Sequence, residues 1–230
     1  GWEDLRFQTD ALMFRRYEPE YQTEMKGIAD GAAKAGAKIF DRAPDAVDVA
    51  VLNSVIDLGQ MKDALRKTRS ALSGINFLKT EDELLIKEEN HKCSAFAATG
   101  SATADGRPVF GQLFMWNGYT GVHWDVLLDV QPAQGHRFVM QTFPGGLHSG
   151  SDFYINDAGL VVGETTVAQT PYDDRGTPQS NRIRKAIQYA SSVDELVAIM
   201  TDRNNGQYTN EWPFANVKTG EVGIFLLGTE

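Results

Sequence analysis

The sequence has very little cysteine: Cys93 is the only one in 230 residues. A single cysteine excludes an intramolecular disulfide and a structural zinc site built from cysteines. The histidines at positions 91, 123, 136 and 148 lack the spacing of metal ligands. The chain also has neither a G-x-x-x-x-G-K-[ST] phosphate loop nor a G-x-G-x-x-G motif. We therefore expect no metal and no organic cofactor.

Basic side chains are also scarce, with 22 against 31 acidic ones and a formal net charge of −9. This balance argues against nucleic acid or an anionic membrane surface as the main partner, because both require a basic face. No run approaches the roughly 20 apolar residues needed to span a bilayer. No N-x-[ST] sequon is present, which disfavours a glycosylated eukaryotic secreted protein. A bacterial periplasmic or secreted setting is the one we favour.

The composition itself is that of a globular domain, with 42% hydrophobic and 10% aromatic residues. Residues 18–40 and 45–67 repeat apolar side chains at spacings of three and four, which predicts two helices. Asp45 or Asp48 is the expected N-cap of the second helix. Residues 80–92 form a charged stretch of the kind that connects domains or is easily cut.

After Cys93 the pattern changes from helices to strands. Apolar runs between turn residues predict strands within 94–116, 123–132, 136–146, 151–167 and 211–227. Residues 179–203 predict two helices, the second capped by Ser191 or Ser192. Strands, then helices, then strands indicate an α+β fold rather than alternating βαβ units. We divide the chain into a helical pro-segment or N-terminal fragment, 1–92, and a core, 93–230, that is open to continuation at its C-terminus.

Cys93 lies where the charged stretch meets a strand of small residues, "CSAFAATG". One interpretation is a small buried hydrophobic side chain. The other is a nucleophile whose own α-amino group serves as its base once the preceding peptide bond is broken. An α-amine has a pKa of about 7.7–8.0 and a thiol about 8.5, so the two exchange a proton readily near neutrality.

Four segments that follow one another carry a resemblance: "HKCSAF", "GQLFMW", "FPGGLHSGSDFYINDAGLVVGETTV" and "RNNGQYTNEWPFANVKTG". They are similar to the phospholipase B-like proteins and, more broadly, to the acyltransferase-type N-terminal-nucleophile (Ntn) hydrolases, which include penicillin acyltransferases and bile-salt hydrolases. The similarity extends over most of residues 17–228. It implies a four-layer αββα sandwich with a helical N-terminal segment.

The resemblance also implies a reaction. The chain would cut itself between Lys92 and Cys93, its two fragments would stay associated, and Cys93 would then hydrolyse or transfer an acyl group at an amide or ester bond. The partner is a small-molecule or lipid acyl substrate. The missing distal third of a phospholipase B-like chain leaves room for a further C-terminal segment or a second copy of the chain.

Particular residues match functional positions of the family. Cys93 matches the nucleophile, Asn210 the amide of the oxyanion hole, and Thr165 and Thr166 a polar group near the oxyanion. The expected substrate-binding side chains are Trp116, Gln112 and Trp212. Asp152, in "SGSDFY", is expected to order a turn.

Two alternatives remain open at this point. A non-catalytic homologue that is never cut would act as a binding or scaffold protein, and Lys92 favours it because many relatives have a small or polar residue there. An ordinary thiol hydrolase would use Cys93 with His91 or His148 as its base.

Overall fold

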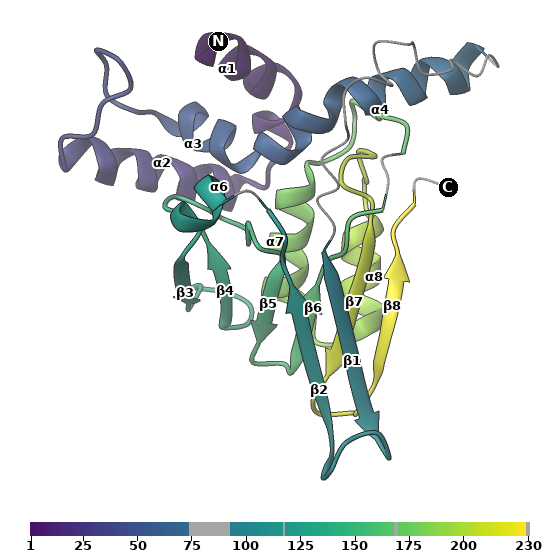
Figure 1. Ribbon diagram of the computed structural model, residues 1–230. Coiled ribbons are helices and arrows are strands. Elements are labelled where there is room, and N and C mark those ends of the chain that lie inside the picture. Colours follow the sequence, from purple (N-terminus) through teal and green to yellow (C-terminus); the bar gives the residue numbers. More distant parts are fainter. Residues whose placement is uncertain (74–92, 117, 168–169, 229–230) are drawn as a thin grey trace.

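The computed structural model describes residues 1–73, 93–116, 118–167 and 170–228 (Figure 1). Lys92 and His91 therefore lie outside the described residues. The N-terminal part is helical, with α1 (Trp2–Leu12), a 3₁₀ turn η1 (Phe14–Arg16), α2 (Pro19–Lys34), α3 (Ala46–Asn53) and α4 (Val55–Ser73).

Helix α2 confirms a helix within 18–40 but ends at Lys34, and its first residue is Pro19, whose fixed φ suits the first turn of a helix. The second predicted helix is divided at Ser54, which ends α3 with a non-helical backbone (φ −113°, ψ 8°). Asp45 is the N-cap of α3, because its carboxylate accepts hydrogen bonds from the amides of Val47 and Asp48.

The rest of the chain forms two antiparallel sheets. Strands β1 (Ser94–Gly100) and β2 (Gly106–Leu113) make a hairpin. A short helix, α6 (Gly118–His123), leads into a six-stranded sheet in the order β3 to β8. Its strands are β3 (Val126–Val130), β4 (Phe138–Thr142), β5 (Phe153–Asn156), β6 (Leu160–Gly163), β7 (Glu211–Asn216) and β8 (Val222–Leu226).

Helices α7 (Gln179–Tyr189) and α8 (Val193–Thr201) cover one face of the six-stranded sheet. Their apolar faces, with Ile183, Ile187 and Leu196, pack on Tyr154 and Trp212 of the sheet in the main core. The second predicted helix of this pair is confirmed with Ser192 as its cap, since its hydroxyl accepts from the amide of Glu195 at 3.2 Å.

The β1–β2 hairpin lies on the other face of the sheet, alongside β7 and β8 (Figure 1). Phe110 on β2 contacts the ring of Phe153 on β5, with 6.5 Å between centroids. An added Cβ on Gly163 would lie 2.8 Å from the Phe110 ring, so glycine permits this close approach. The described residues thus form an α+β fold with a helical layer, a six-stranded sheet and a hairpin.

The N-terminal helices pack at one end of this sheet and are bound to it by buried polar contacts. Asn53 accepts a hydrogen bond from the amide of Leu147 at 2.7 Å and donates to the carbonyl of Gly145 at 3.0 Å. Arg184 on α7 forms a bidentate ion pair with Glu24 on α2, at 2.9 and 3.2 Å. This segment is therefore an integral part of the folded unit.

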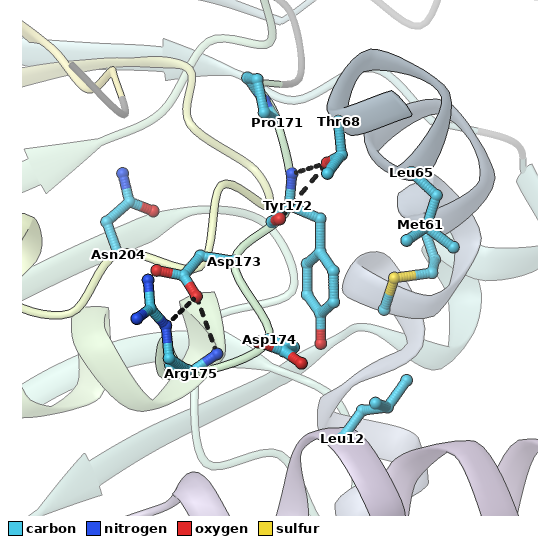
Figure 2. A pocket seen from close by; sticks show the side chains of 10 residues that line it. All are labelled: Leu12, Met61, Leu65, Thr68, Pro171, Tyr172, Asp173, Asp174, Arg175 and Asn204. Carbon is cyan, nitrogen blue, oxygen red and sulfur yellow. Dashed lines mark hydrogen bonds and ion pairs between the residues drawn. The ribbon is translucent and has the colours of Figure 1, made fainter. Parts of the chain in front are cut away.

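A groove of about 860 Å³ opens between α1, α4 and the loop before α7 (Figure 2). Thr68 on α4 connects its two sides, because its hydroxyl accepts a hydrogen bond from the backbone N–H of Tyr172 at 2.5 Å. Acidic side chains of Asp173 and Asp174 and the guanidinium of Arg175 lie along the loop side. The groove therefore lies at the boundary between the helical segment and the core.

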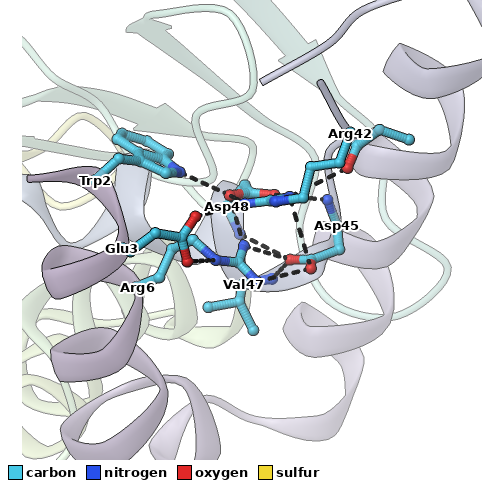
Figure 3. A network of polar contacts seen from close by, with 8 residues as sticks. Trp2, Glu3, Arg6, Arg42, Asp45, Val47 and Asp48 are labelled. Atoms are coloured by element: carbon cyan, nitrogen blue, oxygen red, sulfur yellow. Dashed lines mark hydrogen bonds and ion pairs between the residues drawn. The ribbon is translucent and has the colours of Figure 1, made fainter. Parts of the chain in front are cut away.

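The start of α3 is fixed to α1 by a network around Asp48 (Figure 3). Its carboxylate accepts from Trp2 Nε1 at 2.8 Å, from Arg42 at 2.6 and 2.8 Å, and from the amide of Asp45 at 2.8 Å. Burial alone would raise the pKa of Asp48, but these donors outweigh it and hold that pKa well below its ordinary value.

Within the described ranges, no helix is long and apolar enough to cross a membrane.

Candidate active site

Cys93 immediately precedes β1, and its thiol is only partly buried. The backbone N–H of Met115, just beyond the paired end of β2, donates a hydrogen bond to the sulfur. Side chains alternate between the two faces of a strand, so Cys93 and Ala95 are on the same face. Ala95 is opposite Gln112, whose side chain reaches the six-stranded sheet. The thiol therefore belongs to the face between the two sheets.

Four strand ends meet at this position. Gln112, at the end of β2, donates from Nε2 to the carbonyl of Glu164, just after β6, at 2.9 Å. Thr165 then forms a two-way backbone pair with Glu211, the first residue of β7. The starts of β1 and β7 and the ends of β2 and β6 thus lie together. Most residues predicted for the site come from these four ends.

The surroundings keep the Cys93 thiol protonated. Burial is the largest cause, and it raises the pKa of the thiol to about 11. The hydrogen bond from the Met115 amide acts in the opposite direction, and the negative charges of Glu164 and Asp152 raise the pKa further. The uncut chain therefore holds a thiol, rather than a thiolate, at neutral pH.

Asn210 has the features of an oxyanion donor. It is completely buried, and its Oδ1 accepts a hydrogen bond from the amide of Val167 at 2.9 Å. This bond fixes the orientation of the amide group and leaves Nδ2 with no acceptor in the described part of the chain. Buried donors almost always have a partner. An unpaired N–H beside the strand ends is thus suited to an oxygen atom that arrives with substrate.

The two candidate threonines differ in their contacts. Thr165 is partly buried, and its hydroxyl donates to the carboxylate of Glu211 at 3.3 Å. Thr166 is exposed, and its hydroxyl bonds to the carboxyl group of Glu164. Both therefore lie at the end of β6, but each is already engaged with an acidic side chain. Neither points an unpaired donor at Cys93.

A buried acidic cluster lies beside the cysteine, and sequence reasoning missed most of it. The carboxyl groups of Asp152 and Glu164 are within hydrogen-bonding reach of each other. The hydroxyl of Tyr208 donates toward both, at 2.7 and 2.8 Å. Asp152 thus does more than order a turn. The available signal was Glu164 itself, a charged residue directly after the apolar run "LVVG".

Aromatic side chains are grouped together on the chain that follows β2. Trp116 is 44% exposed and stacks with Phe114 and Trp124, at centroid distances of 6.1 and 6.3 Å. Trp212, in contrast, is completely buried in the core, with its ring edge against Tyr208 at 6.2 Å. Trp116 is therefore placed where a substrate can reach it, whereas Trp212 packs against Tyr208 in the core.

His148 lies in the loop between β4 and β5, with its ring fully buried against the edge of Phe143, 5.9 Å away. Burial lowers the pKa of His148 to about 4, so the ring is neutral at physiological pH. The residues that line the groove of Figure 2, between the helical segment and the loop before α7, do not include Cys93.

The part of the chain that the structure describes contains no group of three or more side chains suited to a metal ion. The chemistry available near Cys93 is thus a thiol, an unpaired amide donor and a pair of carboxyl groups. These groups fit covalent acyl chemistry, in which a nucleophile, a proton acceptor and an oxyanion donor are required.

Comparison with known proteins identifies relatives of this chain. It is 29% identical over 194 residues to an uncharacterized protein of Archaeoglobus fulgidus, covering 83% of this chain and 29% of that protein. It is 25% identical over 220 residues to Phospholipase B-like 1 of Bos taurus, covering 89% of this chain and 37% of that protein. For Phospholipase B-like 1 of Homo sapiens the identity is 23% over 227 residues, covering 92% and 38%.

The chain thus spans less than two fifths of the length of these relatives. The family model for Phospholipase B matches residues 13–222, which includes helices α2 to α4, Cys93 and Asn210. The chain therefore belongs to the phospholipase B family.

Proposed function

We propose that this chain is a self-cleaving N-terminal-nucleophile cysteine hydrolase that acts on an amide or ester acyl bond. One observation carries the proposal: Cys93 immediately precedes β1 at the junction of strand ends where the buried Nδ2 of Asn210 has no acceptor among the described residues. The names of the mammalian relatives, Phospholipase B-like 1, support an acyl hydrolase within this family.

The first reaction is the cut before Cys93. The thiol attacks the carbonyl carbon of Lys92, and the C–N bond breaks as a thioester forms, so that the nitrogen of Cys93 takes the thiol proton and becomes a free α-amine. Water then hydrolyses the thioester, which frees the carboxylate of Lys92 and the thiol of Cys93. The raised pKa of the thiol makes this step slow, because only the thiolate is a strong nucleophile. A single cut in each molecule tolerates a slow rate.

The second reaction uses the new amine. It takes the proton of the Cys93 thiol, and the thiolate attacks the acyl carbon of the substrate. Nδ2 of Asn210 donates to the oxyanion that forms, and Thr165 and Thr166 hold the neighbouring carboxylates in place. Loss of one such oxyanion donor typically costs about 10²–10³ in rate. Water then releases the acyl group.

The substrate in this proposal has an apolar acyl group. The ring of Trp116 is partly exposed beside Phe114 and Trp124, and such a surface suits a hydrocarbon chain of a small molecule or a lipid. The full active enzyme would complete the four-layer αββα sandwich with a further C-terminal segment or a second copy of the chain.

The alternative function is that of a homologue which is never cut and acts as a binding or scaffold protein. One observation favours it: burial raises the pKa of the only thiol to about 11, which suppresses its nucleophilicity. The two functions predict different chemistry at Cys93.

Acyl trapping separates them. The purified chain is mixed with a p-nitrophenyl ester of a fatty acid, quenched in acid and digested. We expect an acyl adduct on the peptide that begins with Cys93, removable by hydroxylamine, and none in Cys93→Ala. Thr99→Ala, on the same strand, is the matched control and should react like the parent. Absence of an adduct in both the parent and the control would contradict the hydrolase.

A further inference from the structure

The proposed mechanism leaves one buried group without a role, the carboxyl pair of Asp152 and Glu164. Neither residue has exposed surface, and the pair is held by the hydroxyl of Tyr208 at 2.7 and 2.8 Å. That hydroxyl has one proton, so it satisfies one carboxylate oxygen at a time. Asp152 also has a left-handed backbone (φ 56°), a conformation that costs energy for any residue other than glycine.

The pair carries an uncompensated negative charge. Two neighbouring carboxyl groups in a buried site do not both ionise, so they share one proton. Burial raises the pKa of both groups, and for Glu164 the charge of Asp152 raises it further. The titratable groups that face the pair are Tyr154 on β5, Tyr208 before β7 and Cys93 before β1. Within the described residues, neither carboxyl group forms an ion pair.

Within the described part of the chain, three buried side-chain oxygens around this pair accept no hydrogen bond other than through the proton that the two carboxyl groups share: Oδ1 of Asp152, Oε1 of Glu164 and Oε1 of Gln112. Gln112 belongs to the same cluster, because its Nε2 donates to the carbonyl of Glu164. Gln112 is also opposite Ala95, two residues from Cys93. Buried acceptors normally have partners, so these three side-chain oxygens fit a group with several N–H bonds and a positive charge.

We propose that Asp152, Glu164 and Gln112 form the binding site for the α-ammonium group that the cut creates on Cys93. This role rests on the proposed function. Before the cut, the nitrogen of Cys93 is an amide with a single N–H. After the cut it is an amine that takes the thiol proton, and the resulting ammonium brings three N–H bonds and a positive charge to the negative pair. Asp152 and Glu164 are thus positioning residues for the base of the reaction.

This arrangement makes the cut change the reactivity of Cys93. In the uncut chain burial is the largest cause of the raised pKa of the thiol, and the negative pair raises that pKa further. In the cut chain the bound ammonium compensates the charge of the pair, so the pKa of the thiol falls. The site therefore activates its nucleophile only after the chain has matured.

Alkylation of Cys93 tests this inference, because no other cysteine competes. The full chain reacts with iodoacetamide at a series of pH values, and intact mass separates the alkylated cut and uncut species in one sample. At pH 8 we expect the cut species to react about tenfold faster or more, since the thiolate fraction rises tenfold for each unit by which the thiol pKa falls.

The double variant Asp152→Asn/Glu164→Gln removes the charge of the pair with little change in shape, and asparagine tolerates the backbone of Asp152. In the double variant the uncut species should react up to about tenfold faster than the uncut parent at pH 8, and the advantage of the cut species should shrink. Gln112→Met, a milder change in a partly exposed side chain, should leave the uncut rate unchanged and lower the cut rate. Asp30→Asn, on the exposed face of α2, is the control.

The outcomes distinguish the two proposals. A parent sample that contains no cut species overturns the proposed function and this role with it. A parent that is cut, but whose cut and uncut species react equally, overturns this role alone. Equal uncut rates in the parent and in the Asp152→Asn/Glu164→Gln double variant, with folding confirmed by circular dichroism, also overturn it.

Discussion

Arg184 connects the core to the N-terminal helices, and replacing it with methionine tests how firmly the two are joined. Its side chain is only 3% exposed and forms the bidentate pair with Glu24. It also donates to the carbonyl of Leu147 at 3.1 Å and lies over the rings of Tyr21 and Phe138. Methionine keeps the hydrocarbon stem in place but removes the charge and the donors.

The expected cost follows from these contacts. Removing one partner of a buried ion pair costs about 3–5 kcal/mol. Glu24 is 38% exposed, so water partly compensates its loss, and we expect the lower end of that range. Arg184→Met should therefore reduce the free energy of unfolding by about 3 kcal/mol. In a cut chain the same change should weaken retention of the helical fragment about 100-fold, because 1.4 kcal/mol corresponds to a factor of ten.

Urea denaturation followed by tryptophan fluorescence measures the change. Arg184→Met and its control, Lys185→Met, are both made in the Cys93→Ala background, so that the chain stays in one piece. With a typical slope, about 3 kcal/mol moves the midpoint down by about 1 M urea. Lys185→Met is the matched control, because the ion pair of Lys185 with Glu18 is partly exposed and should contribute less than about 1 kcal/mol.

Equal midpoints for Arg184→Met and Lys185→Met would refute the reasoning. That result would mean that the buried position of Arg184 adds nothing to the pair. A shift confined to Arg184→Met would support a helical segment that stays bound after the chain is cut.

Three further predictions follow from other contacts. Asn53→Ala leaves the buried amide of Leu147 without an acceptor and should destabilise the fold by about 2–3 kcal/mol in the same urea assay; an unchanged midpoint would contradict it. Asp48 has a lowered pKa, so it contributes stability above about pH 4 that is lost as the pH falls further. Asp48→Asn should therefore weaken the dependence of the free energy of unfolding on pH below about pH 4. An unchanged dependence would count against the network of Figure 3. Asn210→Ala should slow ester turnover by about 10²–10³, while Thr165→Ala should have a much smaller effect; similar losses in both would remove Asn210 from the oxyanion role.

Much of the fold was predictable from local patterns. Ser192 before an apolar repeat, and Asp45 before "AVDVAV", mark helix starts through the bonds their side chains make to nearby amides. The break at Ser54 was not predicted, because "LNSVID" continues the helical periodicity. There the backbone follows tertiary contacts: Asn53 binds Leu147 and Gly145, and the Ser54 hydroxyl meets that of Tyr17.

The site was predictable where a motif is continuous in sequence. Cys93 and Asn210 were selected from a resemblance, and the structure places both at the same junction of strand ends. The partnership of Asp152 with Glu164 was not predicted, because it depends on the pairing of β5 with β6 and on Tyr208 from a distant loop. An acidic residue at a strand end is usually solvated, and only tertiary structure reveals that these two are buried together.

The most direct test of the central claim is the intact mass of the purified protein after prolonged incubation at neutral pH. We expect two species from the parent chain, divided between Lys92 and Cys93, whose masses sum to that of the 25.4 kDa chain plus one water. Cys93→Ala should remain a single species. An uncut parent chain, or a Cys93→Ala chain cut at the same bond, would show that Cys93 does not cleave its own chain.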